Sequence, residues 1–267
     1  MDLGLKDKVA IITGGSRGVG RGIARAFAGE GVKLVLTARR ANLLDETADE
    51  IRKEYGVEVL TVPADMGSAD DIKRMVQAAV DRFGRVDILV NNAASFSYGS
   101  MFELTDDDWL NHFNNKTFGY LRCMREVVPH MQKNHWGRII NVAGGASRQA
   151  GLGQGGGSAG ATNAAIINIS KSMSDVLAKD GITVNVVHPG AADSDREELR
   201  VAWMSETRGV PKEQIEAELA RNVPPIGRKV ISSDTGALVT LLVSRQMEAL
   251  TGQTIAIDGG NSRAIVY

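Results

Sequence analysis

Thr13-Gly14-Gly15-Ser16-Arg17-Gly18-Val19-Gly20 follows a short β-branched run, Val9 to Ile12, and opens a segment of helical period that extends to Gly29. Glycines at 14, 18 and 20 let the backbone turn tightly and approach a pyrophosphate closely. The phosphate charge would then lie against the free amides and the positive dipole end of the following helix. The stretch therefore predicts a dinucleotide site, although a glycine-rich turn alone is a weak signal.

Short apolar runs alternate with segments of helical period along most of the chain. The apolar runs lie at 9–12, 34–36, 57–62, 86–90, 138–142 and 182–187. The helical segments lie at 18–29, 42–54 and 70–83, in a long stretch ending near 132, and in an Ala/Ile-rich stretch before Gly181. Parallel strands joined by right-handed crossovers become buried on both faces. The alternation predicts an α/β fold: a single-domain, Rossmann-type, doubly wound parallel sheet with helices on both faces.

The size and charge of the chain limit the classes of function. A chain of 267 residues with 43% hydrophobic and 24% charged residues is expected to form one domain, residues 1–267. The formal net charge of -1 gives no electrostatic reason to expect nucleic acid or an anionic membrane as a partner. A small-molecule substrate is favoured by elimination.

The single cysteine and the amino terminus indicate the compartment. Cys123 cannot form an internal disulfide, which fits a reducing cytoplasm. The segment from Met1 to Asp7 has neither a basic region nor an apolar core, and no apolar run is long enough to span a bilayer. We therefore expect a cytoplasmic protein without a targeting segment or a membrane anchor.

Two segments interrupt the alternation. Residues 151–157, Gly-Leu-Gly-Gln-Gly-Gly-Gly, are too rich in glycine for a regular element, and residues 193–219 form a charged, helix-like insertion after the sixth strand. Both follow carboxyl ends of strands, where open α/β sheets bind their ligands. We interpret the first as an active-site loop and the second as a lid. The alternative for either is a plain flexible surface loop.

Further motifs extend the pattern set by the glycine-rich turn. They are Asp65, Asn91-Asn92-Ala93, Pro189-Gly190 with Ser194, and Gly252-Gln253 with Asp258-Gly259-Gly260. Together with the turn they resemble the short-chain dehydrogenase/reductase family over nearly the whole chain. The resemblance implies a nicotinamide dinucleotide as cofactor. The candidate cofactor-binding residues are Gly14, Ser16, Arg17, Gly18, Val19, Gly20, Arg39, Asp65, Met66, Asn92, Ala93, Pro189, Gly190 and Ser194.

The end of the second strand predicts which dinucleotide is preferred. NAD-preferring members of the family hold an acidic residue there for the ribose hydroxyls, and this chain has Ala38 instead. Arg39 and Arg17 can flank a 2′-phosphate, which guanidinium groups bind bidentately. We therefore expect NADP(H) to be preferred over NAD(H). The alternative is that both arginines are solvated surface charges.

The positions that carry catalysis in the family are altered. The family uses a Tyr and a Lys four residues apart on one helix, and counting back from Gly181 places Ala159 and Asn163 there. The family's Ser corresponds to Gly144, three residues beyond Asn141. The chain therefore resembles an atypical member that lacks the Ser, Tyr and Lys.

The fourth family position, an Asn that holds a relay water, corresponds to Lys116 on the spacing to Gly119 and Pro129. Lys116 and Asn163 have thus exchanged residue types, and in the family these two positions are neighbours in space. A partly desolvated lysine there can serve as general acid or base, or as an electrostatic clamp on an oxyanion. The alternatives are a local bulge that places the adjacent Asn115 in the site, or a snorkelling surface lysine.

Two further side chains are candidates for the altered site. Ser147 lies close to Gly144 and is a substitute for the missing serine. Tyr98 follows Asn91-Asn92-Ala93 on a loop expected to border the pocket, and its phenol is a substitute for the lost one, although packing is the commoner role. Together with Lys116 and Asn163 they complete the set of candidate catalytic residues.

Three functions remain open from the sequence. The first is an atypical NADP(H)-dependent oxidoreductase that transfers a hydride to or from a small carbonyl or alcohol, imine or enone. The second is a non-redox enzyme, a lyase, decarboxylase or isomerase, on the same scaffold. The third is a catalytically silent NADP(H)-binding protein. By resemblance we expect a homo-oligomer, a tetramer or dimer, with the apolar tail Ala264-Ile265-Val266-Tyr267 suited to a subunit contact.

Overall fold

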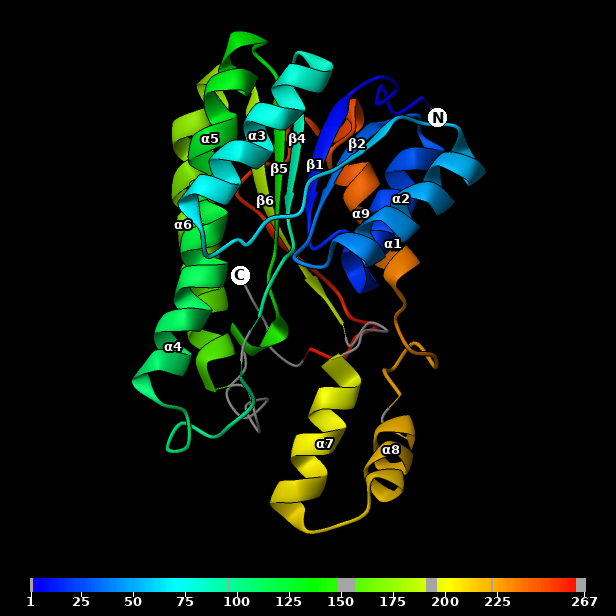
Figure 1. Cartoon of the computed structure of the whole chain (residues 1–267), viewed down its shortest axis with the longest axis vertical. Coiled ribbons are helices and arrows are strands. Elements are labelled where there is room, and N and C mark those ends of the chain that lie inside the picture. Colours follow the sequence, from blue (N-terminus) through cyan, green and yellow to red (C-terminus); the bar gives the residue numbers. More distant parts are fainter. Residues whose placement is uncertain (1, 96, 148–156, 191–195, 222, 263–267) are drawn as a thin grey trace.

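A seven-stranded parallel sheet forms the centre of the computed structural model (Figure 1), which describes residues 2–95, 97–147, 157–190, 196–221 and 223–262. The strand order is β3-β2-β1-β4-β5-β6-β7, so the chain winds outward in both directions from β1 and β4. The strands are β1 (Val9–Thr13), β2 (Lys33–Thr37), β3 (Val59–Thr61), β4 (Ile88–Asn91), β5 (Gly137–Val142), β6 (Ile182–Pro189) and β7 (Thr254–Ile257). The doubly wound parallel sheet predicted from the sequence is confirmed.

Helices cover both faces of this sheet. In Figure 1, α3, α5 and α6 lie on one side and α1, α2 and α9 on the other. Their bounds are α1 (Gly18–Gly29), α2 (Ala41–Tyr55), α3 (Ala69–Phe83), α5 (Gly119–Lys133), α6 (Gly157–Leu177) and α9 (Ser232–Leu242). A short helix α4 (Asp106–His112) and a π-helical segment η1 (Phe113–Phe118) precede α5 without a break.

The alternation of side chains along β1 divides the core into two layers. Ile12 packs with Ile23 and Phe27 beneath α1, whereas Ile11 packs with Met75 and Val127 beneath α3 and α5. All six side chains are fully buried. Both faces of the strand are therefore apolar, as expected for a parallel strand covered by helices on each side.

Two elements differ from the sequence expectation. The third apolar run was expected at 57–62, and β3 comprises only Val59–Thr61, because only Leu34 to Leu36 of β2 pair with it. The seventh strand, Thr254–Ile257, was not expected. It is only half-buried at this edge of the sheet, so its sequence lacks the continuous apolar run that marks the inner strands.

The charged insertion after β6 contains two helices, α7 (Arg196–Arg208) and α8 (Lys212–Arg221). In Figure 1 they extend beyond the carboxyl ends of the strands, away from the sheet. The glycine-rich stretch 151–156 and the tail 264–267 lie outside the described residues. Among the helices that the structure describes, none is long and apolar enough to cross a membrane.

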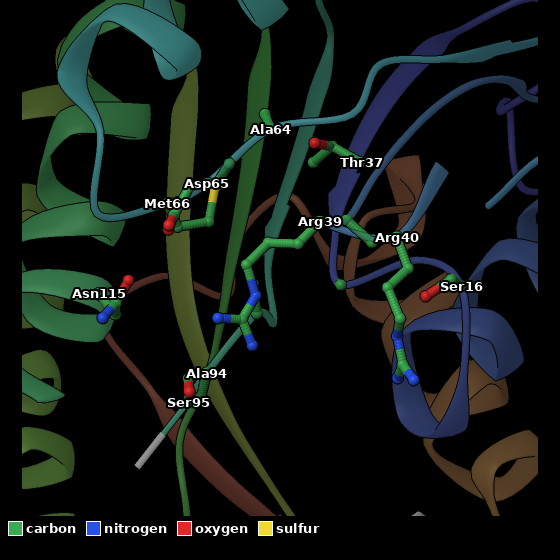
Figure 2. Close-up of a pocket in the computed structure, with 13 residues that line it drawn as sticks. Ser16, Thr37, Arg39, Arg40, Ala64, Asp65, Met66, Ala94, Ser95 and Asn115 are labelled. Atoms are coloured by element: carbon green, nitrogen blue, oxygen red, sulfur yellow. The ribbon is translucent and has the colours of Figure 1, made fainter. Parts of the chain in front are cut away.

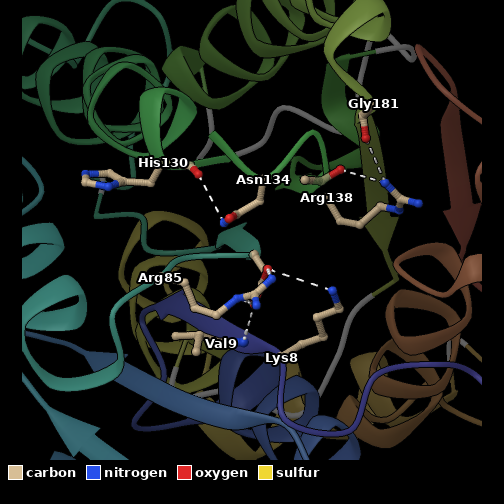
Figure 3. A network of polar contacts seen from close by, with 9 residues as sticks. Lys8, Val9, Arg85, His130, Asn134, Arg138 and Gly181 are labelled. Atoms are coloured by element: carbon tan, nitrogen blue, oxygen red, sulfur yellow. Dashed lines mark hydrogen bonds and ion pairs between the residues drawn. The ribbon is translucent and has the colours of Figure 1, made fainter. Parts of the chain in front are cut away.

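A network of charged side chains closes the amino ends of the strands (Figure 3). The fully buried Asp87 carboxylate accepts hydrogen bonds from the Val9 amide at 2.9 Å and from Arg85 at 2.8 and 2.6 Å, and Lys8 lies 3.9 Å away. Burial lowers the pKa of Lys8, and the Asp87 charge opposes this shift. The network ties β1 to β4 at the edge opposite the glycine-rich turn.

Asp87→Asn is expected to lower the free energy of unfolding by about 2–3 kcal/mol, because the buried charge that holds three donors is lost. Urea unfolding at neutral pH measures this. Asp81→Asn is the matched control, since Asp81 is exposed and accepts from Gln77; a change within about 0.5 kcal/mol is expected. Equal effects of the two substitutions would contradict the prediction.

Candidate active site

A pocket of about 590 Å³ opens at the carboxyl ends of β1, β2 and β4 (Figure 2). It lies where the strand order reverses between β1 and β4, the place at which doubly wound sheets bind their ligands. Its lining residues are Gly14, Ser16, Thr37, Ala38, Arg39, Arg40, Ala64, Asp65, Met66, Ala93, Ala94, Ser95 and Asn115.

The glycine-rich turn brings two backbone segments closer than side chains allow. Gly14 has a φ of 68°, in the left-handed region that favours glycine. A Cβ atom at Gly20 would lie 2.2 Å from the Gly14 carbonyl oxygen and 2.6 Å from the Asn92 amide nitrogen. The turn is thus folded back onto the first turn of α1. This geometry presents the amino end of α1 to the pocket, which fits a bound pyrophosphate.

Asn92 shapes this turn from the neighbouring strand. Its amide donates to the carbonyl oxygens of Thr13 at 3.0 Å and Gly14 at 3.2 Å. The Thr13 hydroxyl in turn accepts from the backbone amides of Asn92 and Ala93, at 2.9 and 3.0 Å. Asn92 therefore acts on the pocket through the backbone of the turn, and its neighbour Ala93 lines the pocket directly.

The arginines differ in their relation to the pocket. Arg39, from the end of β2, extends across it in Figure 2, and Ala38 leaves this rim without a carboxylate. Arg40 also lines the pocket and lies on the side of Ser16. Arg17 is the N-cap residue of α1 and is absent from the lining set. Of the two arginines named from the sequence, Arg39 lines the pocket and the role of Arg17 stays a prediction; Arg40, which was not named, also lines the pocket.

Of the other predicted cofactor residues, some line this pocket and others do not. Asp65 and Met66 line it, and the Asp65 carboxylate accepts from the Gly67 amide at 2.8 Å. Gly18 and Val19 lie in the first turn of α1. Pro189 ends β6, and Gly190 packs against Asp258, where a Cβ would lie 3.0 Å from the Asp258 Cα. Ser194 lies outside the described residues.

The π-helical segment η1 carries both Asn115, which lines the pocket, and Lys116, which does not. Asn115 faces the pocket and the Gly67 backbone, because a Cβ at Gly67 would lie 2.7 Å from its side-chain oxygen. The Asn115 amide donates to the Asn111 carbonyl at 2.8 Å. A bulge of the kind considered from the sequence is therefore present, and it turns Asn115 toward the β3 side of the pocket.

Lys116, the next residue of the same segment, is buried. It is only 6% exposed, and its Nζ is 6.0 Å from the centre of the Tyr120 ring. The Tyr120 hydroxyl donates to the carbonyl of Val142, the last residue of β5, at 3.0 Å. Lys116 is thus a buried side chain beside Tyr120. The alternative of a snorkelling surface lysine does not fit this burial.

Asn163 fills the space next to Gly144, just beyond β5. A Cβ atom at Gly144 would lie 2.9 Å from the Asn163 amide nitrogen. Asn163 is 4% exposed, and its side-chain oxygen has no hydrogen-bond partner among the described residues. The absence of a side chain at Gly144 therefore leaves the space that the Asn163 side chain occupies. A larger residue at position 144 would require that the Asn163 side-chain amide move.

Gly144→Ser alone is expected to lower the free energy of unfolding by about 1–3 kcal/mol, because the new side chain overlaps Asn163. Combined with Asn163→Ala, the same substitution is expected to cost less than the sum of the single changes. Thermal unfolding of the four proteins tests this coupling. Gly29→Ser is the control, since a Cβ there meets only Tyr55 at 3.8 Å; additive effects of the paired changes would contradict the prediction.

The remaining candidates occupy distinct places. The Ser147 hydroxyl donates to the Gly144 carbonyl at 2.9 Å, so in this arrangement it presents only lone pairs to a substrate. The Tyr98 ring stacks on Trp203 of α7, with ring centres 6.3 Å apart and planes inclined by 26°. Tyr98 therefore joins the loop after β4 to the helical insertion. Cys123 is fully buried, and burial raises the pKa of its thiol to about 12, which excludes a reactive thiolate.

One buried histidine near the site was missed by sequence reasoning. His112, the last residue of α4, places its Nδ1 2.8 Å from the Ser158 Oγ, and both residues are 1% exposed. Its partner is 46 residues away in the chain, so no local pattern marks the pair. The only signal available was that His112 precedes Lys116 by one helical turn.

Comparison with known proteins agrees with this architecture. The family model for short chain dehydrogenases matches residues 8–205, so the chain belongs to the short-chain dehydrogenase family. A 3-oxoacyl-(acyl-carrier-protein) reductase, FabG, of Staphylococcus epidermidis is 32% identical over 95% of this chain and 98% of that protein. The NADPH-dependent reductase BacG of Bacillus subtilis is 29% identical over 98% of this chain and all of that protein.

A solved structure with the same fold is the L-sorbose reductase of Gluconobacter frateurii, described in complex with NADPH and L-sorbose. Its TM-score is 0.91 at 29% identity, covering 99% of this chain and 100% of that chain. The relatives are named as reductases of the same family, which supports an oxidoreductase function for this chain.

Proposed function

We propose that the protein is an NADP(H)-dependent oxidoreductase that transfers a hydride to or from a small carbonyl or alcohol, imine or enone, with an atypical proton-transfer site. The observation that carries the proposal is the pocket at the β1/β4 switch point, with Arg39 across it and Ala38 in place of a carboxylate. The printed names of relatives, an NADPH-dependent reductase and a reductase complexed with NADPH, support the same cofactor.

The residues of the pocket suit a phosphorylated dinucleotide. The amino end of α1, brought close by Gly14 and Gly20, would hold the pyrophosphate. Arg39, together with Arg40, would bind the 2′-phosphate through charge-assisted hydrogen bonds. Asp65 and Met66 would border the adenine. When bound, the nicotinamide supplies or accepts the hydride.

In this proposal Lys116 supplies the proton that a tyrosine supplies in other members. Position 159 is alanine, position 163 is asparagine and position 144 is glycine, so none of the three can donate as the family's Tyr, Lys and Ser do. The Lys116 Nζ, partly desolvated beside Tyr120, donates a proton to the oxygen on which negative charge develops. Asn163, with a buried side-chain oxygen, orients a polar group of the substrate or cofactor.

We further propose that residues 193–219 form a lid over the substrate. The helices α7 and α8 lie beyond the carboxyl ends of the strands, and Arg208 binds Glu218 across the helix pair at 2.9 Å. The Tyr98–Trp203 stack is the contact through which this lid meets the loop after β4. Exclusion of water by such a lid strengthens the electrostatic effect of a buried ammonium.

Deuteride transfer from 4-deuterated NADPH to a panel of small ketones, aldehydes, imines and enones tests the function. Transfer of label into a product, with loss of reduced nicotinamide, is the expected result. Conversion of a substrate without net cofactor oxidation would instead identify a non-redox enzyme. Tight NADPH binding with no conversion of any compound would identify a silent binding protein, and binding of neither NADPH nor NADH would exclude the proposal.

A further inference from the structure

A polar seam, His112 with Ser158 and Thr162, joins α4 to α6 in the interior. His112 Nδ1 lies 2.8 Å from the Ser158 Oγ, and His112 Nε2 lies 3.5 Å from the Thr162 Oγ1. The three residues are 1%, 1% and 0% exposed. Both ring nitrogens thus face hydroxyl groups of a single helix.

The Thr162 hydroxyl also lies within hydrogen-bond distance of backbone carbonyls of its own helix, with Ser158 O at 3.1 Å and Ala159 O at 3.2 Å. Each ring nitrogen of His112 can donate or accept according to the tautomer, and a hydroxyl can do either, so both contacts can be hydrogen bonds.

The seam lies between the two segments that carry the altered site. His112 ends α4, and η1 with Lys116 begins at the next residue. On the other side, Ser158 directly precedes Ala159, and Thr162 directly precedes Asn163. The turn η1 is a π-helix, with i→i+5 hydrogen bonds in place of the i→i+4 bonds of the helices on either side, and it is in contact with α6.

We propose that His112 is a positioning residue that holds η1 against α6, and so keeps Lys116 in its buried place beside Tyr120. The inference rests on the role proposed above for Lys116. An apolar pair at 112 and 158 would fill the same interior without desolvating an imidazole. Directional hydrogen bonds to two successive turns of α6 fix both the separation and the rotation of the segments, which apolar packing alone specifies less sharply.

The test uses the double variant His112→Val/Ser158→Ala, which removes both partners of the 2.8 Å bond and leaves neither unsatisfied. Its melting temperature is expected to stay within about 3 °C of wild type. This inference also takes the Lys116 ammonium to lie near the nicotinamide ribose of the bound cofactor. The dissociation constant of the double variant for NADPH, followed by nicotinamide fluorescence, is therefore expected to rise about 5- to 10-fold, as for Lys116→Met. Adding Lys116→Met to the double variant is expected to weaken binding no further, because both changes remove the same interaction.

His112→Asn provides a second measurement, since its amide can reach the Ser158 hydroxyl in place of Nδ1. It is expected to restore NADPH binding to within about 2-fold of wild type. Ser172→Ala, on the exposed side of α6, is the matched control and should leave binding unchanged. If the double variant fails to fold, failure of His112→Asn to bind as wild type while folded still overturns the proposal.

The outcomes separate this inference from the function on which it rests. Wild-type NADPH binding by the double variant, with weaker binding by Lys116→Met, would overturn the positioning role and leave the role of Lys116 intact. Additive losses in the triple variant would also overturn it, because the seam would act independently of the lysine. Unchanged binding and unchanged hydride transfer in Lys116→Met would overturn the proposed role of Lys116 and this inference together.

Discussion

Lys116→Met is expected to slow hydride transfer to a carbonyl substrate about 10²- to 10⁴-fold, the usual contribution of general acid catalysis. Met nearly matches the volume of the buried Lys stem, so the ammonium is removed without opening a cavity. The reaction that remains depends on the proximity of the substrate to the cofactor. Single-turnover oxidation of bound NADPH, followed by absorbance, measures the rate.

Lys171→Met is the matched control for this experiment. Lys171 lies on the exposed side of α6 and pairs with Asp175 at 3.1 Å, so its loss should leave the rate unchanged. Wild-type rates in Lys116→Met would exclude the lysine as proton donor. The exchange Lys116→Asn/Asn163→Lys moves the ammonium from η1 to α6. A rate higher than that of Lys116→Met would indicate that an ammonium between the two segments is what matters, whichever segment carries it.

Arg39→Ala is expected to weaken NADPH binding about 10- to 100-fold while leaving NADH binding unchanged. Hydrogen bonds between charged groups contribute about 1.5–3 kcal/mol, and only NADPH has the 2′-phosphate to receive them. Titration of the purified protein with each nucleotide at matched ionic strength measures both constants. Arg40→Ala, tested in parallel, reports whether the second lining arginine shares the phosphate.

Arg82→Ala is the control for the loss of one positive charge. Arg82 pairs with Glu58 near the amino end of β3, at the edge of the sheet opposite the pocket. Arg82→Ala should weaken the binding of neither NADPH nor NADH by more than about 2-fold, because the field of a distant surface charge is screened by salt. Equal weakening of NADPH and NADH by Arg39→Ala would indicate a general effect on the pocket and contradict selective recognition of the phosphate.

Much of the fold was predictable because its signals are local. The turn from Thr13 to Gly20 and the regular alternation of apolar and helical segments determine a doubly wound sheet without knowledge of the long-range contacts. The half-buried strand β7 escaped prediction because an edge strand needs no continuous apolar run. The π-helical segment η1 was raised from the sequence only as an alternative, since its residues differ little from those of an ordinary helix.

The candidate site was predicted unevenly, for reasons of geometry. Gly14, Ser16 and Asp65 were placed at the pocket because their motifs fix backbone positions. The sequence does not specify the direction of a long side chain, so Arg40, which lines the pocket, was not named, and the role of Arg17 stays a prediction. The His112–Ser158 pair depends on the packing of two helices, and such contacts leave no periodic trace in the chain.

The fit between Gly144 and Asn163 has a consequence for the redesign of such a site. A serine at 144 collides with the amide of Asn163, and a lysine at 163 would bring a second ammonium to the segment facing Lys116. A substitution at 144 is therefore expected to be tolerated better when position 163 is changed with it. Redesign of this part of the molecule is expected to require that these positions be varied together, as one unit, rather than one at a time.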